Sequence, residues 1–227
     1  MKQYFLGIEF GSTRIKAVLL DEKHAIVKSG DYTWKSSLEN GVWTYHMEDV
    51  QEGLRTAIRN LGELPGKISA MGVSGMMHGY LAFDKDWNLL APFRTWQNTM
   101  TGEAADKLTE AFGFNIPQRW SAAHLYQAVL NGEPHVKNIA HVTTLAGYVH
   151  YLLTGENVLG VGEASGMFPI DSETLTYDAA MLDKFDALMA KYGFDWNIRA
   201  VLPEVRTAGQ SAGLLTPSGS EYLGGLL

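Results

Sequence analysis

The sequence contains no cysteine, so disulfide bonds, thiolate nucleophiles and zinc sites built on sulfur are excluded. It also lacks any apolar run approaching the roughly 20 residues that a membrane-spanning helix needs. The N-terminal apolar run meets Glu9 too early for a secretory signal. These absences predict a cytoplasmic protein that makes no use of a membrane.

Positive charge is also scarce, with 18 basic residues against 25 acidic ones and a formal net charge of −7. The basic residues are scattered along the chain, whereas nucleic acids and anionic membranes select for clustered ones. Neither partner is therefore expected. The remaining composition, 46% hydrophobic and 19% charged over 227 residues, is ordinary for a soluble globular protein.

The first third of the chain has the pattern of a β-meander followed by a crossover. Short apolar or alternating runs at residues 4–10, 15–21 and 25–34 predict three antiparallel strands joined by tight turns. Apolar residues then recur at helical spacing between Val50 and Leu61. Residues 67–75 follow as a predicted buried strand, which that helix would connect to the meander.

Helical patterns dominate after about residue 100. The apolar spacing predicts helices over residues 145–153 and 181–192, each ended by a glycine, and a hairpin over residues 79–90. The fold class is therefore α/β, one domain with a mixed sheet and a helical insertion. The final run, "LLTPSGSEYLGGLL", predicts the entry to another strand and favours a chain that continues.

Chemistry-bearing residues gather in the first predicted turn, within "GIEFGSTRIKAVLLD". Gly11 would let the backbone approach a ligand, and successive amides in such a turn form an anion-binding nest. Ser12 and Thr13 add hydroxyl donors, Lys16 adds a cation, and Glu9 could hold a hydrated Mg²⁺. Spacing alone leaves a second interpretation open, a surface hairpin with incidental polar residues.

This segment resembles the first phosphate motif of the FGGY carbohydrate kinases, within the actin/Hsp70/sugar kinase superfamily. The resemblance implies a ribonuclease H-like lobe that binds ATP with Mg²⁺. Glu9 departs from the motif, because the family usually has aspartate there. The matching residues are Gly7, Ile8, Gly11, Ser12, Thr13, Lys16 and Asp21.

A second group of residues, within 72–101, has the chemistry of a sugar site. An indole ring such as that of Trp96 can cover the apolar face of a sugar, while His78 and Asn98 can bond hydroxyls. Taken singly, the pattern favours a core or loop histidine for His78 and a packing aromatic for Trp96. Together with Met77, they resemble the Gln-Met-His-Gly turn and later tryptophan of xylulokinase-like members. Met76 stands where that turn has glutamine.

A third stretch resembles the family's helix ending in Leu-Thr-Gly and its following loop near the substrate cleft. Gly155, Ala164, Ser165 and Gly166 match that pattern. Glu163 lies in the same loop. Two interpretations stay open for it, an acid that reaches a sugar hydroxyl and a solvated loop acid.

The resemblance therefore implies that residues 1–227 are the N-terminal, sugar-binding domain of a carbohydrate kinase. The implied acceptor is a ketopentose such as xylulose, and the full-length enzyme could be a homodimer. The family's catalytic aspartate and its C-terminal nucleotide-binding domain are expected beyond Leu227. No catalytic residue is then expected within the chain, which alone should not turn over. The alternatives are a non-catalytic sugar sensor or scaffold of the same fold, and an ATPase whose output is motion.

Overall fold

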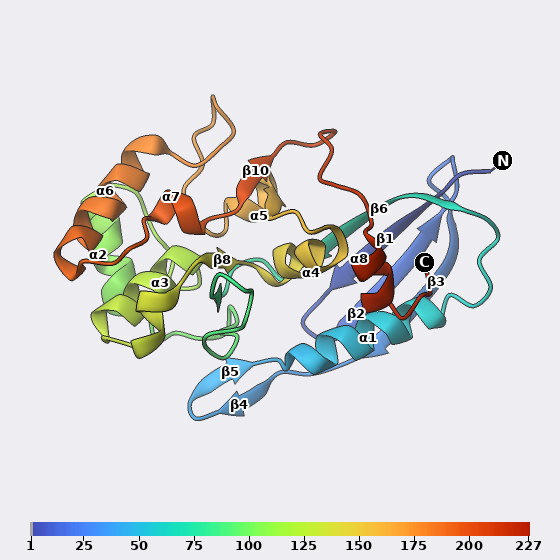
Figure 1. Ribbon diagram of the computed structural model, residues 1–227, viewed down its shortest axis with the longest axis horizontal. Helices are drawn as coiled ribbons and strands as arrows, with labels where there is room; N and C mark the ends of the chain where they lie inside the picture. Colours follow the sequence, from blue (N-terminus) through green and yellow to red (C-terminus); the bar gives the residue numbers. More distant parts are fainter. Residues whose placement is uncertain (1) are drawn as a thin grey trace.

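A computed structural model describes residues 2–227 and contains a four-stranded mixed sheet at its N-terminal end (Figure 1). The strand order is β3-β2-β1-β6, with β1, β2 and β3 antiparallel and β6 parallel to β1. The helix α1 (Met47–Arg59) makes the crossover between β3 and β6. The predicted meander and crossover are confirmed. The strand bounds are β1 (Tyr4–Phe10), β2 (Arg14–Leu20), β3 (Ile26–Thr33) and β6 (Ile68–Gly75).

One face of this sheet is buried and the other is open. Alternate residues of β1, namely Leu6, Ile8 and Phe10, pack against α1, because side chains of a strand point to opposite faces in turn. On the opposite face Glu9 and Lys16 are exposed. The prediction that residues 67–75 form a buried strand is wrong in its burial. The strand exists, but it lies at an edge of the sheet and presents small residues to the open face.

Shorter strands complete the β-structure. The strand β7 (Leu81–Phe83) pairs mainly with β8 (His141–Thr143), so the hairpin predicted over residues 79–90 is only partly confirmed. Its turn does form, since the Asp84 carboxylate accepts bonds from the N–H groups of Asp86 and Asn88, each at 2.9 Å. The other pairs are β4 (Ser37–Glu39) with β5 (Val42–Thr44), antiparallel, and β9 (Val158–Gly160) with β10 (Glu204–Arg206), parallel.

The helices predicted from apolar spacing are present. The helix α4 (Leu145–Thr154) ends at Gly155 with a positive φ of 78°, and α6 (Ala179–Met189) begins at the capping side chain of Asp178. No helix among residues 2–227 is long and apolar enough to cross a membrane. The other helices are α2 (Gly102–Phe112), α3 (Ser121–Leu130), α5 (Val161–Ala164), α7 (Ile198–Val201) and α8 (Pro217–Tyr222), with the 3₁₀ turns η1 (Pro134–Asn138) and η2 (Ala190–Tyr192).

The expected strand in the last run of the chain is wrong, because α8 occupies that place. Thr216 caps this helix by accepting a hydrogen bond from the N–H of Gly219, and Pro217 occupies the first turn. Proline suits that position because the first turn has no intrahelical partner for an N–H. Leu223 follows the helix and is fully buried against the core beneath the sheet.

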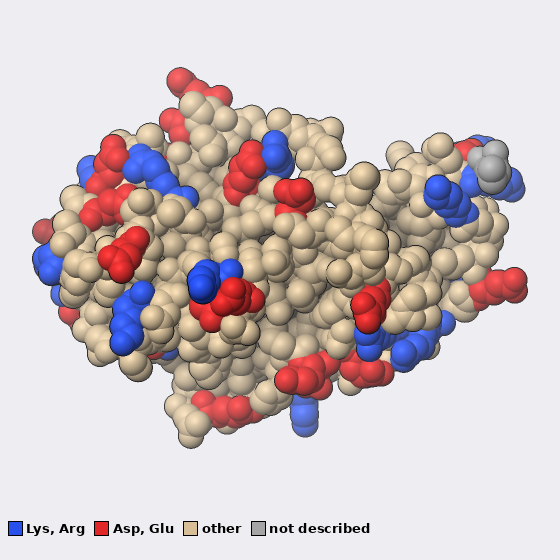
Figure 2. Space-filling model, in the orientation of Figure 1, with Lys and Arg blue, Asp and Glu red and all other residues tan. Residues whose placement is uncertain are grey.

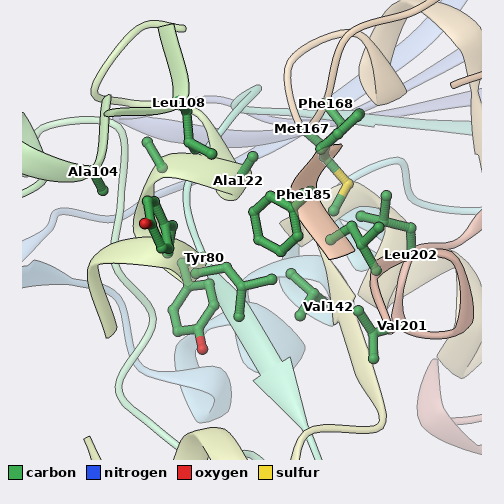
Figure 3. Packing of buried hydrophobic residues seen from close by; sticks show 14 of the residues in the cluster. Tyr80, Ala104, Leu108, Ala122, Val142, Met167, Phe168, Phe185, Val201 and Leu202 are labelled. Atoms are coloured by element: carbon green, nitrogen blue, oxygen red, sulfur yellow. The ribbon is translucent and has the colours of Figure 1, made fainter. Parts of the chain in front are cut away.

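One apolar core lies under the sheet and a second lies among α2, α3 and α6, and Figure 3 shows residues of the second from close by. The strand β7 separates them. Leu81 and Phe83 belong to the first core, whereas Tyr80 and Ala82 belong to the second. The segment just before β7 therefore emerges where the two cores meet.

Acidic and basic side chains are interspersed over the face shown in Figure 2.

Candidate functional site

The tip of the β1–β2 hairpin is the first part of the candidate site. Its shape is fixed by a 2.9 Å hydrogen bond from the Gly11 N–H to the Arg14 carbonyl. Two aromatic side chains hold the tip from behind, since the Trp34 indole donates to the Gly11 carbonyl and the Tyr45 hydroxyl to the Ser12 carbonyl, each at 2.7 Å. With these carbonyls turned inward, the tip cannot easily change shape.

The tip leaves hydrogen-bond donors free toward solvent. Ser12 and Thr13 are exposed, and neither of their N–H groups has a partner among residues 2–227. A Cβ at Gly11 would lie 3.1 Å from the Arg14 carbonyl oxygen and 3.6 Å from Oε1 of Glu9. Glycine therefore keeps open the space beside the Glu9 carboxylate. Two free amides and two hydroxyls are suited to the oxygens of a phosphate.

Glu9 and Lys16 face each other directly across the β1–β2 ladder. Lys16 Nζ lies 3.0 Å from Glu9 Oε2, and both side chains are about half exposed, at 47% and 50%. Beside them the open face is hollowed by about 350 Å³. Gly7 and Gly72, paired in register on adjacent strands, contribute to this hollow because they carry no side chains.

These residues fit a nucleotide phosphate chain with Mg²⁺. Magnesium is commonly held by one or two carboxylates together with waters and substrate phosphates, and Glu9 supplies one such carboxylate. Lys16 supplies a cation directly beside the Glu9 carboxylate. The free amides of the hairpin tip complete a donor set for anionic oxygens.

The turn of residues 77–79 is the second part of the site, and it is rigid. His78 and Gly79 both have left-handed backbone conformations, with φ of 71° and 90°. The Gly79 N–H donates to the Arg119 carbonyl at 3.1 Å, and the Gly79 carbonyl accepts from the Ser121 hydroxyl at 2.5 Å. A positive φ is unfavourable for a histidine, so the surrounding contacts must enforce this shape.

His78 is anchored by the loop after α5. Its Nδ1 lies 3.0 Å from the carbonyl oxygen of Gly166, and a carbonyl can only accept, so Nδ1 carries the proton. A Cβ at Gly166 would come within 2.7 Å of that nitrogen and 3.0 Å of Met77 Cε. Burial lowers the pKa of His78 below its usual 6.5, partly offset by the Gly166 bond. The imidazole is therefore neutral near pH 7, with Nε2 as an acceptor.

The two parts lie at the same edge of the sheet. The Met76 N–H donates to the Phe10 carbonyl at 2.9 Å, so the residues just before the hairpin tip and just before the histidine turn are joined. This juxtaposition follows from the parallel pairing of β1 and β6, which brings their carboxyl ends to one edge. Ligands of open α/β sheets commonly bind at that edge.

Trp96 and Asn98, predicted together for the sugar pocket, have different surroundings. The Trp96 side chain is 44% exposed and free to meet a ligand, whereas Asn98 is only 3% exposed. Asn98 accepts a 2.8 Å bond from the Trp43 N–H and donates to the Trp43 and Thr95 carbonyls at 2.9 and 3.0 Å. Its amide thus binds the β4–β5 hairpin to the Trp96 segment.

Glu163, for which two interpretations stayed open, is largely buried. Burial raises the pKa of its carboxyl group, against the effect of a hydrogen bond with Thr144, and its Oε1 atom has no partner within residues 2–227. It is therefore not a solvated loop acid. Glu163 lies on the short helix α5, three residues before Gly166, the partner of His78, so it is close to the site in the chain.

Sequence reasoning missed the residues that support the site from behind. Trp34 and Tyr45, whose ring centroids lie 4.2 Å apart with the planes tilted by 33°, hold the hairpin tip. Each stands two residues after another aromatic, Tyr32 or Trp43, and nothing in that spacing marks which of the two supports the tip. The β4–β5 hairpin did carry a signal, because Asn-Gly at residues 40–41 is the usual sequence of a tight hairpin turn.

Comparison with known proteins gives a consistent result. The sequence model described as "FGGY family of carbohydrate kinases, N-terminal domain" matches residues 4–226. Glycerol kinase of Thermococcus gammatolerans is 25% identical over 230 residues, covering 94% of this chain and 45% of that protein. Xylulose kinase of Escherichia coli (strain K12) is 24% identical over 218 residues, covering 90% and 45%.

Among solved structures, gluconate kinase from Lactobacillus acidophilus superposes with a TM-score of 0.82 at 19% identity, covering 99% of this chain and 46% of that one. At this identity the likeness shows the fold alone, and the predicted α/β fold class of the sugar kinases is confirmed. The chain spans about half the length of the curated relatives that it matches.

Proposed function

Because this chain belongs to the FGGY family of carbohydrate kinases, as an N-terminal domain of that family, we propose that it supplies the sugar site and part of the phosphate site of an ATP-dependent kinase. The observation that carries the proposal is the meeting of the two parts at one sheet edge, joined by the Met76–Phe10 hydrogen bond. Donors for phosphate lie on one side of this junction and groups for a sugar lie on the other.

On the phosphate side, the N–H groups of Ser12 and Thr13 bind oxygens of the nucleotide. Lys16 would exchange its bond with Glu9 for a bond with a phosphate oxygen, and the Glu9 carboxylate would then be the residue that helps hold Mg²⁺. The metal, when bound, screens the charge that builds on the transferred phosphoryl group. These residues position charge and need not react themselves.

On the sugar side, His78 accepts a hydrogen bond from a hydroxyl through Nε2, since Nδ1 is used by Gly166. Trp96 offers its ring to the apolar face of the sugar, and Met77 forms an adjacent apolar wall. Asn98 contributes by holding the Trp96 segment in place. The rigid turn at residues 77–79 keeps the acceptor atom fixed, which favours one hydroxyl position over others.

The acceptor that we propose is a ketopentose such as xylulose. The Met-His-Gly turn supports it, as do relatives named xylulose kinase, although the relatives also include glycerol kinases. Transfer also requires a base for the attacking hydroxyl. We propose that this base comes from a second lobe, corresponding to the half of the relatives that this chain does not span. Residues 1–227 alone are then expected to bind but not to turn over.

The alternatives of a sensor, a scaffold or an ATPase without sugar transfer are not favoured by these comparisons. By name, the three proteins compared above are kinases of glycerol, xylulose and gluconate. The Trp96 side chain and the acceptor nitrogen of His78 also suit a hydroxyl-rich ligand better than they suit a protein partner.

The test is a calorimetric titration of the chain with xylulose, other ketoses, glycerol and gluconate, with and without MgATP. The variant His78→Ala removes the acceptor atom, and His46→Gln changes a half-exposed histidine elsewhere as the matched control. We expect binding of xylulose that His78→Ala abolishes and His46→Gln preserves. Tighter binding of glycerol than of xylulose would indicate glycerol as the acceptor in place of a ketopentose. Sugar binding that survives His78→Ala would refute the pocket.

A further inference from the structure

A polar cluster lies inside the second core, directly behind the histidine turn. Its members are Tyr80, Arg94, Glu133 and His135, hereafter the Tyr80 cluster. Tyr80 is fully buried and Arg94 is 7% exposed. The Tyr80 hydroxyl lies 2.8 Å from His135 Nε2, and the Arg94 guanidinium is hydrogen-bonded to the Glu133 carboxylate. Figure 3 shows the Tyr80 hydroxyl directed away from the labelled apolar side chains around it.

The four side chains of the Tyr80 cluster interact mainly with one another. His135 Nδ1 faces Glu133 Oε2 at 3.6 Å, and the negative charge of this carboxylate favours a proton on Nδ1, with Nε2 accepting from the Tyr80 hydroxyl. The Arg94 guanidinium also lies over the Tyr80 ring, 5.4 Å from its centroid. Glu133 accepts a further bond from Asn131 at 3.2 Å. Each side chain thus contacts at least one other member of the cluster.

The backbone connects this cluster to both sugar-facing residues. Tyr80 and Arg94 exchange two backbone hydrogen bonds, of 2.8 and 3.1 Å, which form an isolated antiparallel bridge. Tyr80 is two residues after His78, and Arg94 is two residues before Trp96. The bridge therefore sets how far the histidine turn lies from the tryptophan segment.

Stability does not explain this cluster well. A buried ion pair commonly costs about as much in desolvation as it returns in attraction, and apolar residues of the same volume serve a core equally well. The Arg94 Nη1 atom and both ring nitrogens of the adjacent His124 are even left without partners in the described chain. Directional bonds, in contrast, fix one arrangement of the groups that make them.

We propose that the Tyr80 cluster consists of positioning residues, which hold His78 and Trp96 at the separation that the sugar requires. The proposal rests on the proposed function, in that it names what sets the shape of the same site. None of the four side chains needs to touch the sugar. They act through the Tyr80–Arg94 bridge.

The test compares two buried tyrosines that differ in one respect. Tyr80→Phe removes a hydroxyl bonded to His135, whereas Tyr177→Phe removes a buried hydroxyl that has no partner among residues 2–227. The readout is the nuclear magnetic resonance signal of the Trp96 indole N–H, assigned by its loss in Trp96→Phe, and of the His78 imidazole. The Trp34 indole, bonded to Gly11, is the internal reference.

We expect Tyr80→Phe to shift the Trp96 and His78 signals without shifting that of Trp34, and Tyr177→Phe to shift none of the three. Unchanged Trp96 and His78 signals in Tyr80→Phe would overturn the proposal, and so would equal shifts in the two variants. This readout needs no ligand, so it decides the proposal even if the wild-type chain binds no sugar.

A second measurement uses sugar binding where the wild-type chain shows it. Loss of one positioning hydrogen bond is worth on the order of 1 kcal/mol, so Tyr80→Phe should weaken xylulose binding by about five- to tenfold. Tyr177→Phe should leave the affinity within about twofold. Equal affinities in the wild type and Tyr80→Phe would count against the cluster. Absence of binding in the wild type would count against the proposed function instead.

Discussion

His124 makes the pH dependence of stability predictable at a single side chain. It is fully buried on α3, it stacks on Tyr80 with 6.4 Å between ring centroids, and neither of its ring nitrogens has a partner in residues 2–227. Burial, with a smaller contribution from the positive charge of Arg94, lowers the pKa of His124 from 6.5 to about 3. The folded protein therefore keeps this ring neutral at any mildly acidic pH.

The unfolded chain does not keep the His124 ring neutral at mildly acidic pH. Below pH 6.5 the unfolded His124 binds a proton that the folded one refuses until about pH 3, so the free energy of unfolding falls as the pH falls through this window. At about pH 5 the gap from 6.5 is roughly 1.5 units, which corresponds to a loss of about 2 kcal/mol relative to pH 7.5. That is a large part of the 5–15 kcal/mol typical of a folded domain, in order of magnitude.

The assay is urea unfolding of the wild type and His124→Leu at about pH 7.5 and pH 5. Leucine fills a similar volume with no polar atom, so we expect the variant to lose about 2 kcal/mol less than the wild type on acidification. The other buried histidines are present in both proteins and cancel in this comparison. His46→Gln, at a half-exposed histidine, should behave as the wild type does. Equal acid sensitivity of the wild type and His124→Leu would refute the reasoning.

Three further predictions concern the site. Gly79→Ala should cost about 2–4 kcal/mol of unfolding free energy in urea titrations, because its Cβ would lie 2.7 Å from the Arg94 carbonyl oxygen at a φ of 90°. The control is Gly155→Ala, at a φ of 78° with nothing within 4 Å of the added Cβ, which should cost about 1 kcal/mol. Equal costs of the two substitutions would contradict the clash. Asn98→Ala should cost about 2 kcal/mol, seen as a lower thermal midpoint, and an unchanged midpoint would show that its buried bonds contribute little. Lys16→Met should weaken MgATP binding in calorimetry by about tenfold while changing stability by less than about 1 kcal/mol, since its ion pair is half exposed; unchanged MgATP affinity would remove Lys16 from the phosphate site.

Local patterns in the sequence were sufficient for the sheet and three helices, α1, α4 and α6. Alternation along β1 and β2 and the i, i+4 spacing in α1 report burial on one face, and each pattern is complete within a dozen residues. The burial of β6 was predicted wrongly because it depends on what covers the open face, which is a property of the assembled sheet. The pairing of β7 with β8 joins residues about 60 positions apart and leaves no local pattern.

The candidate site likewise combines residues whose grouping follows from a local pattern with residues that distant contacts bring together. The grouping of residues 9–16 could be predicted because one hairpin carries them all. The contact of His78 with Gly166 spans 88 positions, and only the family resemblance placed both segments near one cleft. Asn98 was predicted to face the sugar, since an amide beside a tryptophan suits hydroxyls. Its burial against Trp43 depends on the β4–β5 hairpin, for which the Asn-Gly signal at residues 40–41 was present.

The position of β7 between two cores has a consequence for how the site responds to change. The hairpin that we propose to bind phosphate rests on the first core through Ile8, Phe10 and Ile15, all of which belong to it. The histidine turn leads into Tyr80, which belongs to the second. A substitution inside the second core should therefore disturb the sugar side before it disturbs the phosphate side. The two proposed binding functions would then vary separately in sequence, because different cores support the two parts of the candidate site.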